Sequence, residues 1–219
     1  MRRYVRLDRL SHSTERRLRR LQGRARQVRV AGGTLKPSQF EAEVSFVVIE
    51  LLNMWSNAAK WYFVSCARGA RSSQGQQIHS ALALVDDNDA VGAAVRVFHP
   101  GATPSGATGL WDRRDEPSWH DPNTLVRLSS AAHLSNAVTI SGSFGLGAKV
   151  FRDLPVFRNY FAHRNRETRM AAQRIGRPYG VNTLQNPSKI LCEVPVGRGA
   201  SVLEEWIDEI SATIRLLCG

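Results

Sequence analysis

The strongest pattern of hydrophobic positions lies between residues 38 and 66. Apolar side chains recur there at intervals of three and four residues, which is the spacing of one face of a helix: Phe40, Val44, Val47, Val48, Leu51, Trp55, Ala58 and Tyr62. Further aromatic and aliphatic residues widen this face, so we expect a central, well-buried helix. Ser38 and Glu41 have the spacing of a capping box at its first turn, and Gly69 follows its end.

Shorter stretches with the same periodicity predict further helices. They cover about residues 14–30, 78–85, 90–98, 122–136, 149–170 and 202–217. Asp121 followed by Pro122 is typical of an N-cap and the first helical position, whereas Pro155 is expected to break or begin a helix. No run of strands is predicted. The expected fold class is therefore all-α, a bundle with four or five main helices.

Two segments depart from this bundle pattern. Residues 99–120 contain three prolines and three glycines, which predicts a long loop that carries Trp111 and Trp119. Residues 1–36 have few apolar positions among many arginines. They are predicted to form a basic N-terminal arm or helix whose ordering depends on a partner. Residues 37–219 are expected to form the helical domain.

The charge of the 219-residue chain indicates an anionic partner. The formal net charge is +11, and 26 of the 30 basic residues are arginine. Residues 1–30 hold 11 arginines against two acidic residues, and residues 149–177 hold eight basic residues against two acidic ones. Two concentrated clusters bind phosphate better than the same charge spread thinly, although a solvated basic face is the simpler alternative. Nucleic acid is the expected partner class.

Several classes of protein are disfavoured by composition. Three cysteines lie far apart without a CxxC pair, which argues against a zinc knuckle and against a disulfide framework. No apolar run is long enough to span a membrane, and the N-terminus lacks the apolar core of a signal peptide. We therefore expect a cytoplasmic protein that does not bind membranes and needs no cofactor.

Three other site types fit the sequence poorly. The glycine-rich stretch 142–149 resembles a phosphate-binding loop, but its lysine is one position late and no hydroxyl residue follows it. The histidines show neither HExxH nor HxH spacing, so no metal site is predicted; a loop cluster of His99, His120, Asp112 and Asp121 is the weak alternative. No GxSxG elbow is present for serine catalysis.

Residues 157–164, with the sequence FRNYFAHR, carry the most chemistry. On a helix Asn159 and His163 share one face, and Arg158 lies about 140° round the axis from His163 with a side chain long enough to reach the same groove. A titratable base, an amide and a fixed cation suffice to cleave RNA without metal. In that reaction the 2′-hydroxyl would attack, His163 would move a proton, and Arg158 would neutralise the phosphorane, leaving a 2′,3′-cyclic phosphate.

The string Arg158-Asn159-Tyr160-Phe161-Ala162-His163 resembles the motif of the HEPN superfamily (higher eukaryotes and prokaryotes nucleotide-binding domain). That motif is an arginine, four to six residues and a histidine, often with a polar residue after the arginine. The spacing alone recurs elsewhere in the chain, for example at Arg6–His12, so the intervening residues carry the resemblance. It covers about eight residues closely, and residues 38–217 agree loosely in their all-α character.

The resemblance implies an HEPN-like bundle with Arg158, Asn159 and His163 as catalytic residues. It also implies a homodimer in which two motifs face each other across a composite active site, because one imidazole cannot easily serve both ends of an in-line displacement. The implied role is that of a toxin or antiphage-defence effector that cuts tRNA, mRNA or rRNA under the control of an antitoxin or regulatory partner.

Further residues near the motif are candidate RNA contacts. They are Lys149, Arg152, Tyr160, Arg164, Arg166 and Arg169. Glu167 follows His163 by four residues and has the spacing to hold its imidazolium. Tyr160, Trp111 and Trp119 are candidates for stacking on an unpaired base, with packing in the core as the alternative. For the whole chain, the alternatives are a non-catalytic helical RNA-binding or assembly module and, third, a metal-dependent nuclease.

Overall fold

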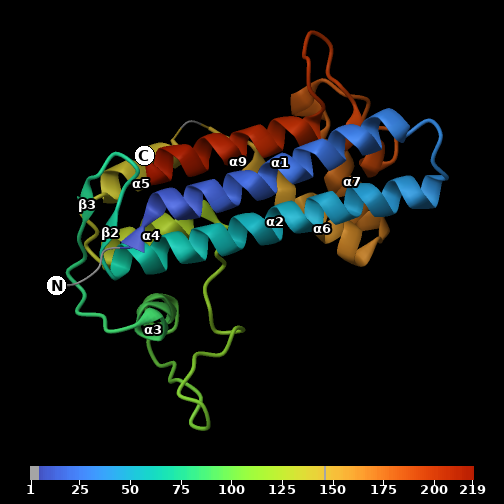
Figure 1. Ribbon diagram of the computed structural model, residues 1–219. Coiled ribbons are helices and arrows are strands. Elements are labelled where there is room, and N and C mark those ends of the chain that lie inside the picture. Colours follow the sequence, from blue (N-terminus) through green and yellow to red (C-terminus); the bar gives the residue numbers. More distant parts are fainter. Residues whose placement is uncertain (1–4, 146) are drawn as a thin grey trace. The chain divides into compact units, whose positions relative to one another are not determined.

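Helices make up most of the chain (Figure 1). A computed structural model describes residues 5–145 and 147–219, and in this part of the chain it contains nine α-helices, one 3-10 helix and three two-residue strands. The α-helices are α1 (Leu7–Ala31), α2 (Pro37–Ala67), α3 (Asp87–Phe98), α4 (Pro122–Ala131), α5 (Ala137–Phe144), α6 (Val150–His163), α7 (Arg166–Ile175), α8 (Pro187–Cys192) and α9 (Val202–Cys218). The predicted all-α class is confirmed.

The described residues form two compact units, each assembled from separate stretches of the chain. The first unit comprises the described part of residues 1–14, residues 55–147 except 146, and residues 213–219. The second comprises residues 15–54 and 148–212. Helices α1, α2 and α9 each contribute residues to both units. The division at residue 36 that the sequence suggested stays a prediction.

The first unit packs α3, α4 and α5 with the last part of α2. Strand β1 (Val5–Arg6) pairs in parallel with β2 (Ala70–Arg71), which pairs antiparallel with β3 (Gln77–Ile78). Trp55 is fully buried, and its indole N–H donates to the carbonyl of His120 at 3.0 Å. This bond ties the end of the long loop to α2.

The loop between α3 and α4 is irregular over residues 99–121, as the sequence predicted for 99–120. Its tryptophans are held by the first unit. Trp119 is buried, its ring centroid lies 6.0 Å from that of Phe63, and its N–H donates to Glu116 at 2.8 Å. Trp111 lies so close to α3 that a Cβ at Gly92 would be 2.3 Å from its Nε1, so only glycine fits there.

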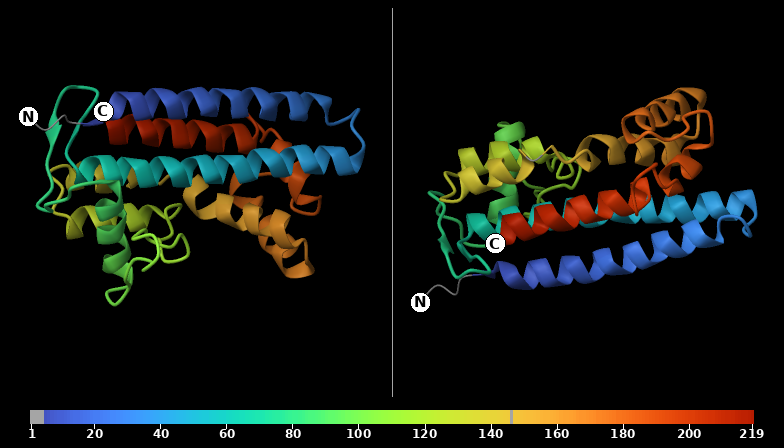
Figure 2. Two further views of the ribbon diagram at one scale, coloured as in Figure 1. Left: turned by 60° about the horizontal axis from the view of Figure 1, so that its bottom comes forward. Right: turned by 90° about the horizontal axis from the view of Figure 1, so that it is seen from above.

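The second unit contains the basic helix α1. In this unit α1, α2 and α9 run side by side (Figure 2). Leu18, Ala25 and Val28 of α1 are buried by other parts of the chain, whereas Val30 near its end is 77% exposed. The helix expected over 14–30 is therefore present and begins earlier, at Leu7.

A buried carboxylate joins α1 to the start of α9 in the second unit. Glu204 is 2% exposed and accepts hydrogen bonds from the backbone N–H of Ser201 at 3.0 Å and from its hydroxyl at 2.7 Å. The guanidinium groups of Arg26 and Arg29 each donate to it at 3.0 Å. Two of the eleven arginines near the N-terminus thus have a structural role.

We expect Glu204→Gln to lower the free energy of unfolding at pH 7 by about 1.5–3 kcal/mol, the range for hydrogen bonds to a charged group. Burial alone raises the pKa of this carboxyl, but the Ser201 hydrogen bonds and the nearby arginines outweigh it and hold the pKa of Glu204 below its usual 4.5. A depressed folded-state pKa stabilises the protein above pH 4.5 and ceases to do so as the pH falls through the folded value.

Urea denaturation from pH 7 to pH 3 measures this effect. The difference between the wild type and Glu204→Gln is expected to shrink below about pH 4.5. Asp208→Asn, an exposed acid on the same helix, is the control and should change stability by less than about 0.5 kcal/mol. A pH-independent difference would contradict the role of the charge.

Three predicted elements are wrong. Residues 78–85 are not helical: Ile78 ends β3, and the hydroxyl of Ser80 donates to the Ala132 carbonyl at 3.0 Å. The helix expected over 122–136 ends at Ala131, and His133 has a left-handed φ of 47°. The helix expected over 149–170 is two helices, and Pro155 lies inside the first without ending it.

Candidate active site at the end of helix α6

Helix α6 is held in the second unit by its buried face. Its N-terminus is capped by the Glu209 carboxylate, which accepts from the backbone N–H of Val150 at 2.8 Å. Burial raises the pKa of Glu209 above its usual value. Phe157 is fully buried, and its ring meets that of Trp206 edge to face, with centroids 5.4 Å apart. These contacts fix which face of α6 points outward.

The outward face of α6 carries the HEPN-like motif. Arg158, Asn159 and His163 are all solvent-exposed. Their side chains form no hydrogen bond or ion pair with any residue of 5–145 or 147–219. The three groups singled out by the sequence therefore share one helix and are all free to meet a ligand.

The helix ends at this motif for a local reason. Arg164 adopts a left-handed conformation, with φ 45°, and its N–H donates to the Tyr160 carbonyl at 2.8 Å. Asn165 then caps α7, its side chain accepting from the backbone N–H of Thr168 at 2.8 Å. His163 is thus the last residue of α6 and stands beside the bend to the next helix.

Three of the predicted RNA contacts surround this bend. Arg164, Arg166 and Arg169 are exposed, and α7 packs against α6. Arg164 Nη1 lies 4.0 Å from Glu41 Oε1, a long contact, and the Arg164 side chain is 54% exposed. Glu167 lies in the first turn of α7, so it is not one helical turn beyond His163 as the continuous helix required.

The other two basic candidates lie at the opposite end of α6. Arg152 and His163 are eleven residues apart, which is about 16 Å along a helix. Lys149 Nζ donates to the Pro178 carbonyl at 3.3 Å and stands 4.9 Å from the Tyr179 ring centroid. Arg152 pairs with the buried carboxylate of Asp153 at 2.6 Å. An RNA strand would have to run along the whole length of α6 to contact both Arg152 and His163.

Tyr160 is turned inward. It is 6% exposed, and its hydroxyl donates to Glu41 at 3.2 Å. Burial, together with the Glu41 carboxylate, raises the pKa of this hydroxyl. Base stacking by Tyr160 would require the ring to leave this position. Trp111 and Trp119 belong to the first unit.

In comparisons with known proteins, no protein-family model, curated protein or solved structure matches the chain.

The sequence did not predict a buried hydrogen-bond network that involves the inner face of α6. The Tyr179 hydroxyl donates to Asp153 at 3.0 Å and accepts from the indole N–H of Trp206 at 2.7 Å. Burial raises the pKa of Tyr179 far above its usual value. These residues come from α6, the 3-10 helix η1 (Arg177–Tyr179) and α9. No sequence spacing connects them, because the contacts are made only by the packed fold.

The described residues also bear on the metal and membrane alternatives. Within 5–145 and 147–219, no group of three or more His, Cys, Asp or Glu side chains is arranged to hold a metal ion. The loop cluster of His99, His120, Asp112 and Asp121 is thus not assembled. In the same residues, no helix has both the length and the apolarity to cross a bilayer.

Proposed function

We propose that this protein is a metal-independent endoribonuclease of the HEPN type, with its active site at the end of α6. The observation that carries the proposal is the exposure of Arg158, Asn159 and His163 without any side-chain partner in the described residues. A histidine or asparagine that held the bundle together would be buried and hydrogen-bonded within it. Groups left free beside a cluster of arginines are suited to an anionic ligand.

The reaction uses the ribose 2′-hydroxyl as nucleophile. His163 takes the proton from this hydroxyl as the oxygen attacks phosphorus, and the bond from phosphorus to the 5′-oxygen breaks. Arg158 lies against the phosphoryl oxygens and neutralises the charge that develops there. Asn159 donates its amide to a phosphate oxygen and fixes the strand. The products are a 2′,3′-cyclic phosphate and a 5′-hydroxyl.

The leaving 5′-oxygen needs a second proton donor. A second copy of the chain supplies it if two α6 ends face each other, so that one His163 acts as base and the other as acid. The proposal therefore includes a homodimer with a composite active site, which sedimentation equilibrium tests by giving twice the chain mass. RNA is positioned by Arg164, Arg166 and Arg169.

The proposed biological setting is that of a toxin or antiphage-defence effector. In that setting the substrate is tRNA, mRNA or rRNA, and an antitoxin or regulatory partner restrains the enzyme. This part of the proposal is supported by the motif resemblance alone.

Cleavage in EDTA tests the proposed reaction. Purified protein is incubated with a mixed-sequence RNA and with its 2′-deoxy counterpart, with EDTA or with Mg²⁺. We expect RNA to be cut equally in both buffers and the 2′-deoxy strand to stay intact. Cleavage that requires Mg²⁺, or cleavage of the 2′-deoxy strand, would contradict the mechanism.

A non-catalytic RNA-binding or assembly module is the second candidate. It is favoured by one observation: no side chain among the described residues holds the His163 imidazole, whereas most general bases are oriented by a neighbour. This candidate predicts RNA binding without any cleavage, with an affinity that follows the arginines of residues 1–30.

A further inference from the structure

A groove opens between α1 and α2 within the second unit. It has a volume of about 510 Å³ and an apolar part formed by Val28, Ala31 and Leu35. The arginines Arg19, Arg20 and Arg24 border it. Its size lies within the range of ligand sites in proteins, about 300–1,000 Å³. None of the residues that line the groove belongs to the HEPN-like motif.

The groove carries an excess of positive charge. Glu43 is the acidic residue that lines it, and it pairs with Arg24 at 2.7 Å. Arg20 is exposed and has no ion pair with any described residue. The same is true of Arg16, which lies one turn earlier, about 6 Å along α1. These two free guanidinium groups form a line leading into the groove.

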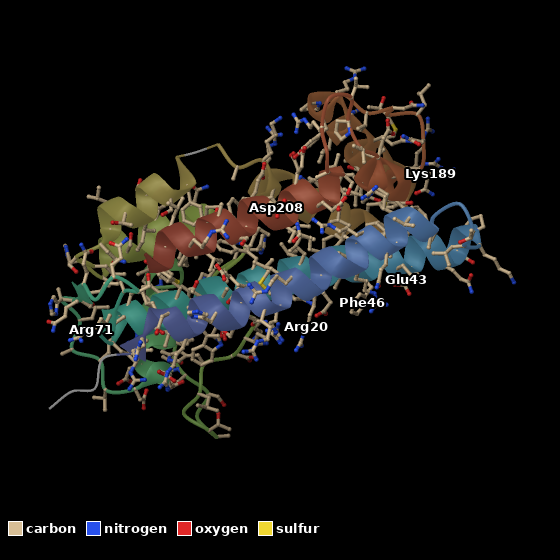
Figure 3. All side chains as sticks on the ribbon, turned by 45° about the horizontal axis from the view of Figure 1, so that its top comes forward. Arg20, Glu43, Phe46, Arg71, Lys189 and Asp208 are labelled. Carbon is tan, nitrogen blue, oxygen red and sulfur yellow. The ribbon has the colours of Figure 1, made fainter. Side chains whose placement is uncertain are left out.

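An exposed aromatic ring stands at the same edge. Phe46 of α2 is 42% exposed, although many of its neighbours along this helix are buried. The Arg24 guanidinium covers it, 4.2 Å from the ring centroid. Figure 3 shows Phe46 and Glu43 on α2 along the same edge as Arg20 on α1. Aromatic rings interleaved with arginines are typical of surfaces that bind single-stranded nucleic acid.

We infer that the groove between α1 and α2 binds single-stranded RNA. Arg16 and Arg20 contact successive phosphates, and Phe46 stacks on a base with Arg24 beside it. An acidic peptide would also satisfy the arginines, but its carboxylates offer no flat face that could stack on the exposed ring. The inference does not rest on the ribonuclease proposal, because binding in the groove needs no cleavage at the end of α6.

Fluorescence anisotropy with a non-cleavable probe tests the groove. The probe is a labelled 2′-O-methyl oligoribonucleotide of about eight nucleotides, a length within the usual site sizes. It cannot undergo attack by a 2′-hydroxyl, so the result is independent of catalysis. Phe46→Ala is expected to weaken binding about tenfold, the effect of losing one stacked base, and Phe46→Trp to preserve it. Arg16→Ala and Arg20→Ala should each weaken binding about threefold at low salt and less at high salt.

Three outcomes would overturn the inference. Arg113→Ala removes an exposed arginine of the 99–120 loop and is the matched control; an equal loss of affinity there would show an unspecific charge effect. Equal affinity for a duplex of the same length would exclude recognition by stacking. Competition by polyglutamate with the same dependence on Phe46 would assign the groove to an acidic peptide. Melting curves confirm that each variant is folded.

Discussion

His163→Ala is expected to lower the rate of RNA cleavage by about 10²–10⁴-fold, the usual contribution of a positioned general acid or base. The affinity for RNA is expected to stay within about twofold, since the proposed phosphate contacts are Arg164, Arg166 and Arg169. Because His163 is exposed and has no hydrogen-bonding partner among the described residues, the substitution should not affect folding. Single-turnover cleavage and anisotropy on the same preparation measure both quantities.

His12→Ala is the matched control for this prediction. His12 is also exposed and follows Arg6 with a spacing that satisfies the bare HEPN pattern. The His12→Ala variant is expected to cleave RNA at the wild-type rate. That result would show that the arginine–histidine spacing alone does not make a histidine part of the reaction. Arg158→Ala should reduce cleavage by about 10²-fold as well, because it removes the cation proposed to neutralise the negative charge of the transition state. Full activity of His163→Ala would exclude it from the reaction.

Trp206→Ala is expected to lower the free energy of unfolding by about 3–5 kcal/mol, the range for replacing a buried aromatic side chain with alanine. Trp206 is fully buried on α9, against the rings of Phe157 and Tyr179. The substitution removes these contacts and leaves the Tyr179 hydroxyl without its indole donor. Because Phe157 sets the orientation of α6, cleavage should fall together with stability.

Urea denaturation followed by circular dichroism measures this loss. Trp61→Ala is the matched control: Trp61 is 45% exposed on α2, so its removal should cost less than about 1 kcal/mol. Trp206→Phe keeps a ring in the core and should lose less than Trp206→Ala. A loss below about 1 kcal/mol for Trp206→Ala would contradict the view that this residue supports α6.

Local sequence patterns predicted those helices whose apolar periodicity and capping residues lie close together in the chain. The stripe from Phe40 to Tyr62 corresponds to α2, and Asp121 caps α4 with its side chain accepting from Asn123 N–H at 2.9 Å. Residues 78–85 show where this reasoning fails. Their apolar spacing suits a helix, but Ile78 pairs in a sheet with Ala70, a contact that spacing cannot reveal.

The candidate site was predictable only in part, for the same reason. The residues of the motif are local, and the structure exposes Arg158, Asn159 and His163 together on α6. The burial of Tyr160 depends on α2, because its partner Glu41 is 119 residues away in sequence. The end of α6 at His163 depends on a left-handed Arg164, a conformation that non-glycine residues adopt infrequently and that periodicity does not signal.

The chemical identity of the cleavage ends tests the central claim most directly. RNA is incubated in EDTA with the native protein and, in parallel, with His163→Ala, and the products are analysed by mass spectrometry. The account predicts 2′,3′-cyclic phosphate and 5′-hydroxyl ends from the native protein and intact RNA from the variant. Ends bearing a 3′-hydroxyl and a 5′-phosphate, or no cleavage by the native protein, would contradict it.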